Sequence, residues 1–244
     1  MKRFRTPREE EVGKNLERIF NACSDPVEIK LENFPKYVRR QHLKRFLALY
    51  ELFKLILPVK GSIVEGGVFR GATLMSWAKL STMLEPENLT RRIYGFDTFE
   101  GFPSIGAQDQ SESTKPEKGE LCSNSYDELL QLIKEYDADR FLGHIGKVEL
   151  IRGDITKTVP EFVQTHQHLI VSLLFMDCDL YEPTKTAIEH FLPRMPKGAI
   201  LAFDELDNPI WPGETLALLE SVGISKLRLQ RFEWEPYIAY AVME

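Results

Sequence analysis

From residue 61 to the C-terminus, short apolar runs alternate with longer segments whose apolar positions recur at helical spacing. Runs of this kind, separated by helices, are typical of a parallel sheet covered by helices on both faces. We therefore predict an α/β fold. The predicted strands are Ser62–Gly66, Ile93–Phe96, Val148–Arg152, Ser172–Met176 and Ala199–Phe203. The predicted helices are Leu74–Leu84, Tyr126–Phe141, Val159–His166 and Thr184–Leu192.

Residues 1–60 precede this alternation and have helical periodicity instead, over residues 7–22 and about Tyr37–Leu57. We assign these N-terminal helices to the same domain as residues 61–244, where they serve as a lid or as a site of contact in an oligomer. Three apolar side chains agree with self-association: Leu52, Leu55 and Ile56. Packing in the core explains those three side chains equally well.

The last part of the chain departs from the alternating pattern. Leu227–Trp234 and Tyr237–Met243 flank a Glu-Pro break, which predicts two strands in a hairpin and an antiparallel pair at one sheet edge. The stretch from Pro103 to Ser125 is polar and lacks periodicity. A loop of this length within a compact domain is either disordered or a functional lid. We expect a mobile loop that orders over a bound ligand.

Charge and composition narrow the class of partner. The 244-residue chain has a formal net charge of −6, which argues against a nucleic-acid partner. No apolar run reaches the ~20 residues of a membrane span, so we expect no membrane partner. The N-terminal sequence lacks the apolar core of a signal peptide, and we expect a cytoplasmic protein. Cys178 lies between two acids, which should raise the pKa of its thiol and keep it a poor nucleophile.

Acidic residues follow two of the predicted strands at the point where each strand ends. Asp177 and Asp179 lie in MDCDLYEPT, and Asp204, Glu205 and Asp207 lie in LAFDELDNP. If the two strands are parallel neighbours, the carboxylates converge at one edge of the sheet. Carboxylates gathered there repel one another unless a cation or a proton joins them. This spacing therefore predicts a divalent-metal site.

The first predicted strand ends in an acid and a glycine-rich turn, in the sequence GSIVEGGVFRGAT. Glycines at Gly66, Gly67 and Gly71 allow a sharp turn and a close approach to a ligand. The dinucleotide fingerprint G-x-G-x-x-G is not met, and Glu65 suits a cationic or amine-bearing ligand better than a pyrophosphate. S-adenosylmethionine carries a sulfonium and an ammonium group. The alternative is a glycine turn without a ligand.

Two further acids end the second and third predicted strands. Asp97 is well placed to accept hydrogen bonds from both hydroxyls of a ribose, or else it caps the next segment. Asp154 accepts from an adenine amino group in one interpretation and caps a helix in the other.

Together the motifs EGGVFRG, YGFDTFEGFP, MDCDLYEPT and LAFDELD resemble the macrocin O-methyltransferase family, which are metal-dependent sugar O-methyltransferases of antibiotic biosynthesis. The similarity runs over most of residues 61–210, and FDELDNPIWPGE resembles the branch that methylates the rhamnosyl unit of calicheamicin. The resemblance implies a class I methyltransferase fold, which is Rossmann-like with a seven-stranded, mainly parallel sheet and an antiparallel C-terminal hairpin. It also implies S-adenosylmethionine as donor, Mg²⁺ as metal, and a nucleotide-linked or natural-product-linked deoxysugar hydroxyl as acceptor.

The resemblance further implies roles for individual side chains. Asp177 matches the first metal ligand, and Asp179 matches the general base, so both are candidate catalytic residues. The family usually carries two adjacent aspartates after the fifth strand, where this chain has Asp204 and Glu205. Glu205 reaches one methylene further, and Asp207 is the alternative third ligand. The residues implied for donor binding are Glu65, Gly66, Gly67, Gly71, Asp97, Thr98, Phe99 and Asp154.

In the mechanism that we expect, a cation lowers the pKa of a sugar hydroxyl while Asp179 takes its proton as the methyl group moves from sulfur to oxygen. His144 is another base candidate, although it precedes the third strand, on the opposite side of the sheet from the acids unless its loop folds back. Two alternatives remain. A metal-dependent glycosyltransferase does not explain the glycine turn after Glu65. A methyltransferase fold that binds a nucleoside or a protein without turnover is supported only by Glu205.

Overall fold

The computed structural model describes residues 6–244, and its contacts divide the chain into two compact units between Leu47 and Ala48. Residues 1–5, on which part of the cytoplasmic prediction rests, lie outside the described residues. No helix within residues 6–244 is both long enough and apolar enough to cross a membrane. The predicted membership of residues 1–60 in one domain with the remainder stays a prediction, and the observed division falls inside a helix.

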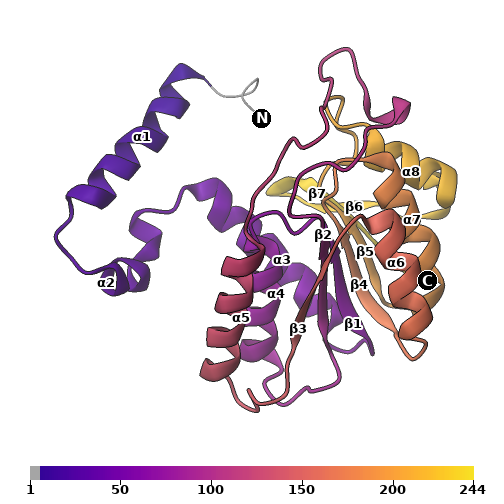
Figure 1. Cartoon of the computed structure of the whole chain (residues 1–244), viewed down its shortest axis with the longest axis horizontal. Helices are drawn as coiled ribbons and strands as arrows, with labels where there is room; N and C mark the ends of the chain where they lie inside the picture. The colour runs from indigo at the N-terminus through magenta and orange to yellow at the C-terminus, as the bar shows by residue number, and fades with distance from the viewer. Residues whose placement is uncertain (1–5) are drawn as a thin grey trace. The chain divides into compact units, whose positions relative to one another are not determined.

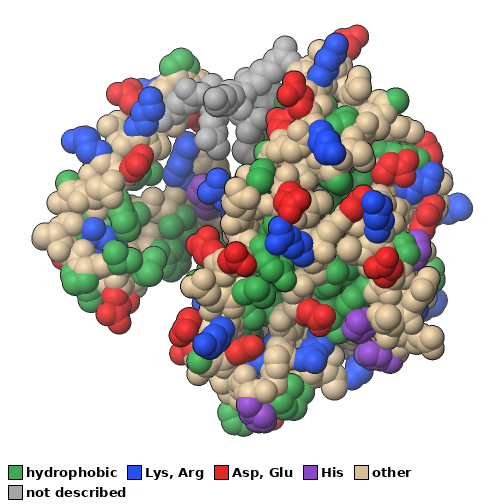
Figure 2. All heavy atoms as spheres, viewed as in Figure 1, with side chains coloured by type: hydrophobic (Ala, Val, Ile, Leu, Met, Phe, Trp, Pro, Cys, Tyr) green, Lys and Arg blue, Asp and Glu red, His purple; other side chains and the backbone are tan. Residues whose placement is uncertain are grey.

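The N-terminal unit is helical. It contains α1 (Pro7–Ala22), α2 (Val27–Glu32), the 3₁₀ turn η2 (Phe34–Lys36) and the first part of α3 (Arg40–Ile56). The Lys30 ammonium is buried and donates a 2.8 Å hydrogen bond to the Phe20 carbonyl. Figure 2 shows apolar side chains on the surface of this unit. Its exposed large apolar residues are Val12, Ile19, Val27, Ile29, Leu31, Phe34 and Leu47.

The second unit is built on a seven-stranded sheet with the order β3-β2-β1-β4-β5-β7-β6. Its strands are β1 (Ser62–Gly66), β2 (Ile93–Asp97), β3 (Val148–Arg152), β4 (Val171–Met176), β5 (Ile200–Phe203), β6 (Gln230–Phe232) and β7 (Glu235–Val242). The first five are parallel, and β7 runs antiparallel between β5 and β6. The predicted fold class and terminal hairpin are confirmed.

Helices cover both faces of the sheet, as the alternating pattern predicted. Figure 1 shows α4 (Ala72–Leu84) and α5 (Tyr126–Asp139) on one face. The other face carries α6 (Ile155–Thr165), α7 (Tyr181–Phe191) and α8 (Gly213–Ser221). The central strands β1, β4 and β5 are buried along their whole length, because they are covered on both faces. The structure adds α2 and α8, which the apolar pattern did not predict.

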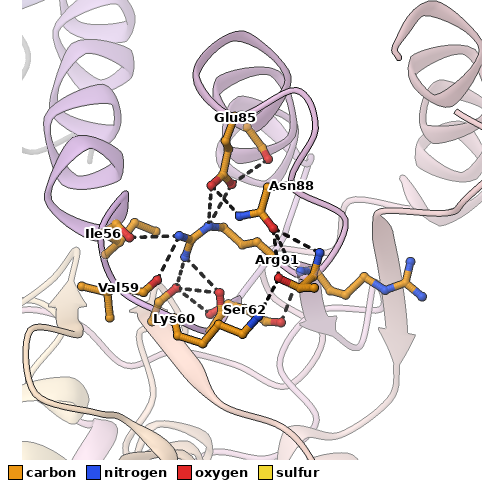
Figure 3. Close-up of polar contacts among 12 residues, drawn as sticks. Ile56, Val59, Lys60, Ser62, Glu85, Asn88 and Arg91 are labelled. Carbon is orange, nitrogen blue, oxygen red and sulfur yellow. Dashed lines mark hydrogen bonds and ion pairs between the residues drawn. The ribbon is translucent and has the colours of Figure 1, made fainter. Parts of the chain in front are cut away.

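A buried arginine holds the amino ends of the central strands to the helices beside them. The Arg91 guanidinium donates to the carbonyls of Ile56 and Val59, at 2.9 and 3.0 Å, at the end of α3. It also pairs with Glu85 after α4, at 2.8 Å, and donates to the Gly61 carbonyl at 2.9 Å. Figure 3 shows these partners converging on the one side chain. Because its Nε and both terminal nitrogens find acceptors, this buried charge is well compensated.

Candidate active site

The register of the parallel strands aligns their carboxyl ends in one row. Phe96, Gly66, Met176 and Phe203 are neighbours across β2, β1, β4 and β5. The residues that follow them are therefore also neighbours, and they are Asp97, Gly67, Asp177 and Asp204. Paired strands lie about 4.8 Å apart, so acids on adjacent strand ends lie close to one another. The predicted meeting of the two acidic loops at one edge of the sheet is confirmed by the pairing of β4 with β5.

The glycine turn after β1 touches the first acidic loop backbone to backbone. Gly67 has φ +88°, and a Cβ on it would overlap the carbonyl oxygen of Asp177. Only glycine tolerates both conditions. The Asp177 amide also donates to the Gly66 carbonyl at 2.8 Å. The turn then ends at Gly71, which begins α4, while Glu65 is fully buried inside β1.

Asp97 organises the backbone around the turn. One of its carboxylate oxygens accepts from the Phe69 amide at 2.7 Å, and the other accepts from the Phe99 amide at 2.6 Å. Phe69 and Phe99 both have positive φ values, at 52° and 60°, which is strained for a non-glycine residue. The carboxylate of Asp97 compensates that strain. Each of its oxygens has a second lone pair with which a ribose hydroxyl can bond.

A cavity of about 630 Å³ opens beside the ends of β2 and β3. Thr98 and Asp154, two of the residues implied for donor binding, line it together with Gly101 and Phe102. Asp154 caps α6 by accepting from the Thr156 amide at 3.0 Å, so the capping interpretation of this residue is correct. Asp154 also lines the cavity, and the capping role and a ligand contact do not exclude one another.

The acidic residues after β4 and β5 differ in exposure. Asp204 is buried, Asp177, Asp179 and Glu205 are half-buried, and Asp207 is exposed. The Glu205 carboxylate accepts a hydrogen bond from the Asn208 side chain. Carboxylate oxygens are the hard ligands that Mg²⁺ prefers. Among residues 6–244, however, no three acidic, histidine or cysteine side chains are arranged as a group that could hold a metal ion. The three residues have the oxygen ligands that Mg²⁺ prefers, but their arrangement does not show a site, so the ligand set Asp177, Asp204 and Glu205 stays a prediction.

A glutamate that the sequence analysis passed over lies beneath the acidic loops. Glu214, in the first turn of α8, is fully buried. Burial and then the nearby charges of Asp179, Asp177 and Asp204 raise the pKa of Glu214 well above its usual range. Glu214 thus lies within electrostatic reach of all three aspartates. One signal for Glu214 was present in the sequence, because it lies three and four residues before the buried Ala217 and Leu218, on the same helical face.

Cys178 behaves as predicted. It is buried, and burial together with the charges of Glu214, Asp97, Asp177 and Asp179 raises the pKa of its thiol well above the ordinary value. A thiol held protonated is a weak nucleophile. Cys178 therefore acts as a packing residue, whose sulfur would lie 3.1 Å from a Cβ placed on Gly66.

The predicted lid, residues 103–125, is attached to the acidic loops through a buried aspartate. Asp109 accepts from the Tyr181 amide, the first residue of α7, at 2.6 Å and from the Gly106 amide at 2.7 Å. Beside it, the Phe102 ring lies 5.8 Å from the Trp211 ring, centroid to centroid. The loop after β2 thus reaches the loops after β4 and β5. Its mobility stays a prediction.

His144 and the acidic loops lie at opposite ends of the parallel strands. It precedes β3, whose first residue is Val148, and it is exposed. The acids follow the carboxyl ends of their strands, whereas His144 lies at the amino end. The structure therefore does not bring His144 to the acidic loops.

The glycine turn after β1 and the acidic loops after β4 and β5 adjoin at one edge of the sheet. Gly67 touches Asp177, so the two halves share a backbone contact. Asp179 is a half-buried carboxylate with φ +61°, held in a strained conformation beside this contact. Such a group, close to a bound hydroxyl, can accept its proton. The arrangement can therefore serve transfer of a group between two bound substrates.

Comparison with known proteins identifies what the chain is similar to. Residues 40–215 match the macrocin-O-methyltransferase (TylF) family. A curated relative, the 8-demethyl-8-(2,3-dimethoxy-alpha-L-rhamnosyl)-tetracenomycin-C 4'-O-methyltransferase of Streptomyces olivaceus, is 27% identical over 165 residues. That match covers 67% of this chain and 60% of the relative, so the chain spans less than two thirds of the length of this relative.

Two solved structures are similar over almost the whole chain. One is described as CalS11, a calicheamicin methyltransferase, with a TM-score of 0.93, 34% identity, and coverage of 98% of this chain and 93% of that one. The other is apo CalS11, described as a TDP-rhamnose 3'-O-methyltransferase in calicheamicin biosynthesis. Its TM-score is 0.85 at 32% identity, with coverage of 98% and 95%.

Proposed function

Because the chain belongs to the macrocin-O-methyltransferase family, we propose that it is an S-adenosylmethionine-dependent O-methyltransferase that acts on a deoxysugar hydroxyl. One observation carries the proposal. The glycine turn implied for the donor lies against the acidic loop implied for the acceptor, with Gly67 in contact with Asp177. Donor and acceptor bound on either side of that contact are held together. Positioning of this kind can lower the activation barrier by on the order of 7–11 kcal/mol.

In this proposal the donor occupies the turn after β1 and the cavity beside β2 and β3. The buried carboxyl of Glu65 faces the positively charged part of the donor, and Asp97 accepts from the ribose hydroxyls. Thr98, Phe99 and Asp154 contribute the remaining contacts. The cavity volume of about 630 Å³ is within the ~300–1,000 Å³ of sites for small molecules, which supports this assignment.

The acceptor hydroxyl then lies over the acidic loops. Asp179 takes its proton as the methyl group moves from sulfur to oxygen, which leaves S-adenosylhomocysteine and a methyl ether. We assign Asp177 and Asp204 as ligands of a divalent cation such as Mg²⁺, with Glu205 as the third. When bound, the ion would lower the pKa of the hydroxyl and neutralise part of the acidic cluster.

The acceptor class follows from the relatives. One acts on TDP-rhamnose at the 3'-oxygen and the other on a rhamnosyl group at the 4'-oxygen, by their descriptions. Both acceptors are rhamnose units, so we propose a 6-deoxyhexose of this kind. Of the three side chains that the sequence analysis offered for self-association, Leu52 and Ile56 are buried in the core, so packing explains them, and Leu55 alone is exposed. We propose that self-association instead uses the exposed apolar residues of the N-terminal unit. Apolar surface of this extent on a short helical segment favours burial against a second copy.

Two measurements test the proposal. Calorimetric titration with S-adenosylhomocysteine should give saturable binding, and its absence would eliminate methyl transfer. Incubation with labelled S-adenosylmethionine and a panel of nucleotide-linked and glycoside-linked deoxysugars should transfer label to one class. A chelator should stop that transfer and added Mg²⁺ should restore it. Turnover that is unchanged by the chelator would refute the role of the metal, but not the methyl transfer. Release of a nucleoside diphosphate would support a glycosyltransferase instead.

A further inference from the structure

One carboxyl group joins the two acidic loops from below. The Cys178 and Asp179 amides donate to one oxygen of Glu214, at 2.9 and 3.2 Å. The Glu205 amide donates to its other oxygen at 3.2 Å. The first two amides belong to the loop after β4, and the third belongs to the loop after β5. Glu214 is therefore a bridge between the loops that carry Asp177 and Asp204.

The geometry gives this bridge little freedom. Gly213 precedes Glu214, and a Cβ placed on it would lie 2.5 Å from the Tyr181 nitrogen at the start of α7. α8 can therefore lie against the β4 loop only because residue 213 has no side chain. The approach carries Glu214 into the interior, where a carboxyl group is costly to bury unless hydrogen bonds satisfy it. Three amides meet that need.

Each amide that Glu214 holds lies in a peptide unit next to a candidate functional acid. The Cys178 amide follows Asp177, the Asp179 amide belongs to the proposed base, and the Glu205 amide follows Asp204. Asp179 has φ +61°, a strained conformation for a residue other than glycine, which needs surrounding support. The hydrogen bond to its amide is such support.

We propose that Glu214 is a positioning residue that sets the spacing and the direction of the two acidic loops. It is fully buried and so acts through Asp177, Asp179 and Asp204 rather than by touching substrate. This inference rests on the proposed function for its effect on turnover. The bridge itself is a property of the backbone and can be measured without substrate.

The test uses Glu214→Gln in the full chain, with Glu182→Gln as the matched control. Glutamine has the shape of glutamate, but one side of its amide donates, so it cannot accept from both loops. Glu182 lies in the first turn of α7, is exposed and holds no loop amide, so its substitution removes a nearby charge alone. We expect faster hydrogen exchange at the amide of at least one loop in Glu214→Gln, and wild-type exchange in the control.

Mg²⁺ titration without substrate should give a Kd weaker by about tenfold or more in Glu214→Gln, with a similar loss in kcat, because mutation of such supporting groups costs about 10–100-fold. The Kd for S-adenosylhomocysteine should stay within about twofold, since the donor turn is not held by Glu214. Unchanged amide exchange and Mg²⁺ affinity, with only a lower Tm, would overturn the proposal and leave Glu214 a structural residue.

Glu214→Asp keeps the carboxyl group but is shorter by one methylene, so it cannot span both loops. If Glu214→Gln does not fold, the aspartate variant decides, and wild-type Mg²⁺ affinity and kcat in that variant would overturn the proposal. Should the wild-type protein bind neither S-adenosylhomocysteine nor Mg²⁺, the proposed function fails, while amide exchange still tests the bridge.

Discussion

Asp177 occupies the point where the two halves of the site touch, because its carbonyl lies against Gly67 and its side chain belongs to the acidic cluster. We predict that Asp177→Ala lowers kcat by at least about a thousandfold, because removing a metal ligand forfeits several kcal/mol of stabilisation in the transition state. The backbone contact with Gly67 remains, so the Kd for S-adenosylhomocysteine should stay near the wild-type value.

Initial-rate kinetics and calorimetry on the same preparation check this prediction. Asp127→Ala, at an exposed position in the first turn of α5, is the control and should match the wild type. Full activity in Asp177→Ala would contradict the assigned role.

Lys147 shows how burial changes stability with pH. It is buried at the start of β3 and donates to the Asn88 carbonyl at 2.6 Å. Burial, which outweighs the attraction of Glu85, lowers the pKa of Lys147 to about 8 from 10.5. Between those two values the unfolded chain binds the proton and the folded chain does not, so this group makes stability rise with pH across that window.

Lys147→Met should therefore raise the free energy of unfolding by about 2 kcal/mol at pH 7, after allowance for the lost hydrogen bond. The gain should shrink as the pH rises through 8 toward 10.5, because the wild-type lysine becomes neutral there. Urea unfolding at several pH values measures this difference. Lys134→Met, at an exposed position of α5, should show no such trend, and a pH-independent gain in Lys147→Met would rule out the proton as its cause.

At the scale of elements, the five parallel strands could be predicted to within a residue or two because each is a short, mainly apolar run between two helical segments. β1, β4 and β5 are buried along their whole length, whereas the edge strand β3 is only partly buried. α8 was missed because Pro212 and Gly213, directly before its first apolar turn, are typical of a loop. α2 is one short turn of helix, too brief for periodicity to show.

The acids at the strand ends could likewise be found from the sequence, because a strand's end fixes where the next side chain lies. The roles of Glu214 and Asp109 could not be assigned, since each also accepts from backbone amides more than thirty residues away in the chain. Because every residue except proline has a backbone amide, the sequence does not show which amide a carboxylate will contact.

The loop attached by Asp109 provides a prediction about an element. Asp109→Ala removes the acceptor of the Tyr181 amide, so residues 103–125 should detach from α7 more often. Limited proteolysis should then cut this loop several times faster, and the KM for the sugar should rise while the Kd for S-adenosylhomocysteine changes little. Glu112→Ala, at an exposed position in the same loop, is the control. Equal cleavage rates in the two variants would show that Asp109 does not hold the loop.

At the scale of the whole molecule, the amino and carboxyl ends of the sheet have separate roles. Arg91 joins α3, the start of β1 and the end of α4 at the amino end (Figure 3). Every candidate functional residue that follows a strand lies at the carboxyl end. We predict that Arg91→Met costs about 3–5 kcal/mol of stability, because it leaves the half-buried Glu85 carboxylate without its counter-charge and the Ile56, Val59 and Gly61 carbonyls without their donor.

The folded fraction of Arg91→Met should still bind S-adenosylhomocysteine with a Kd like that of the wild type. Denaturant unfolding and calorimetry below the Tm separate these two effects. Lys60→Met removes a 2.8 Å hydrogen bond to Thr90 near the same place and should cost less than about 1 kcal/mol. A stable Arg91→Met that had lost donor affinity would show that the two ends are not independent.

The contact between Gly67 and Asp177 has a thermodynamic consequence. Two ligands bound on opposite sides of this contact can change one another's affinity through it. If bound methyl donor changes the affinity for the ion by some factor, bound ion must change the affinity for the donor by the same factor, because the two routes to the doubly bound state have the same total free energy. The strength of that coupling would then depend on the contact at Gly67, and a substitution that separates the turn from the loop would weaken it.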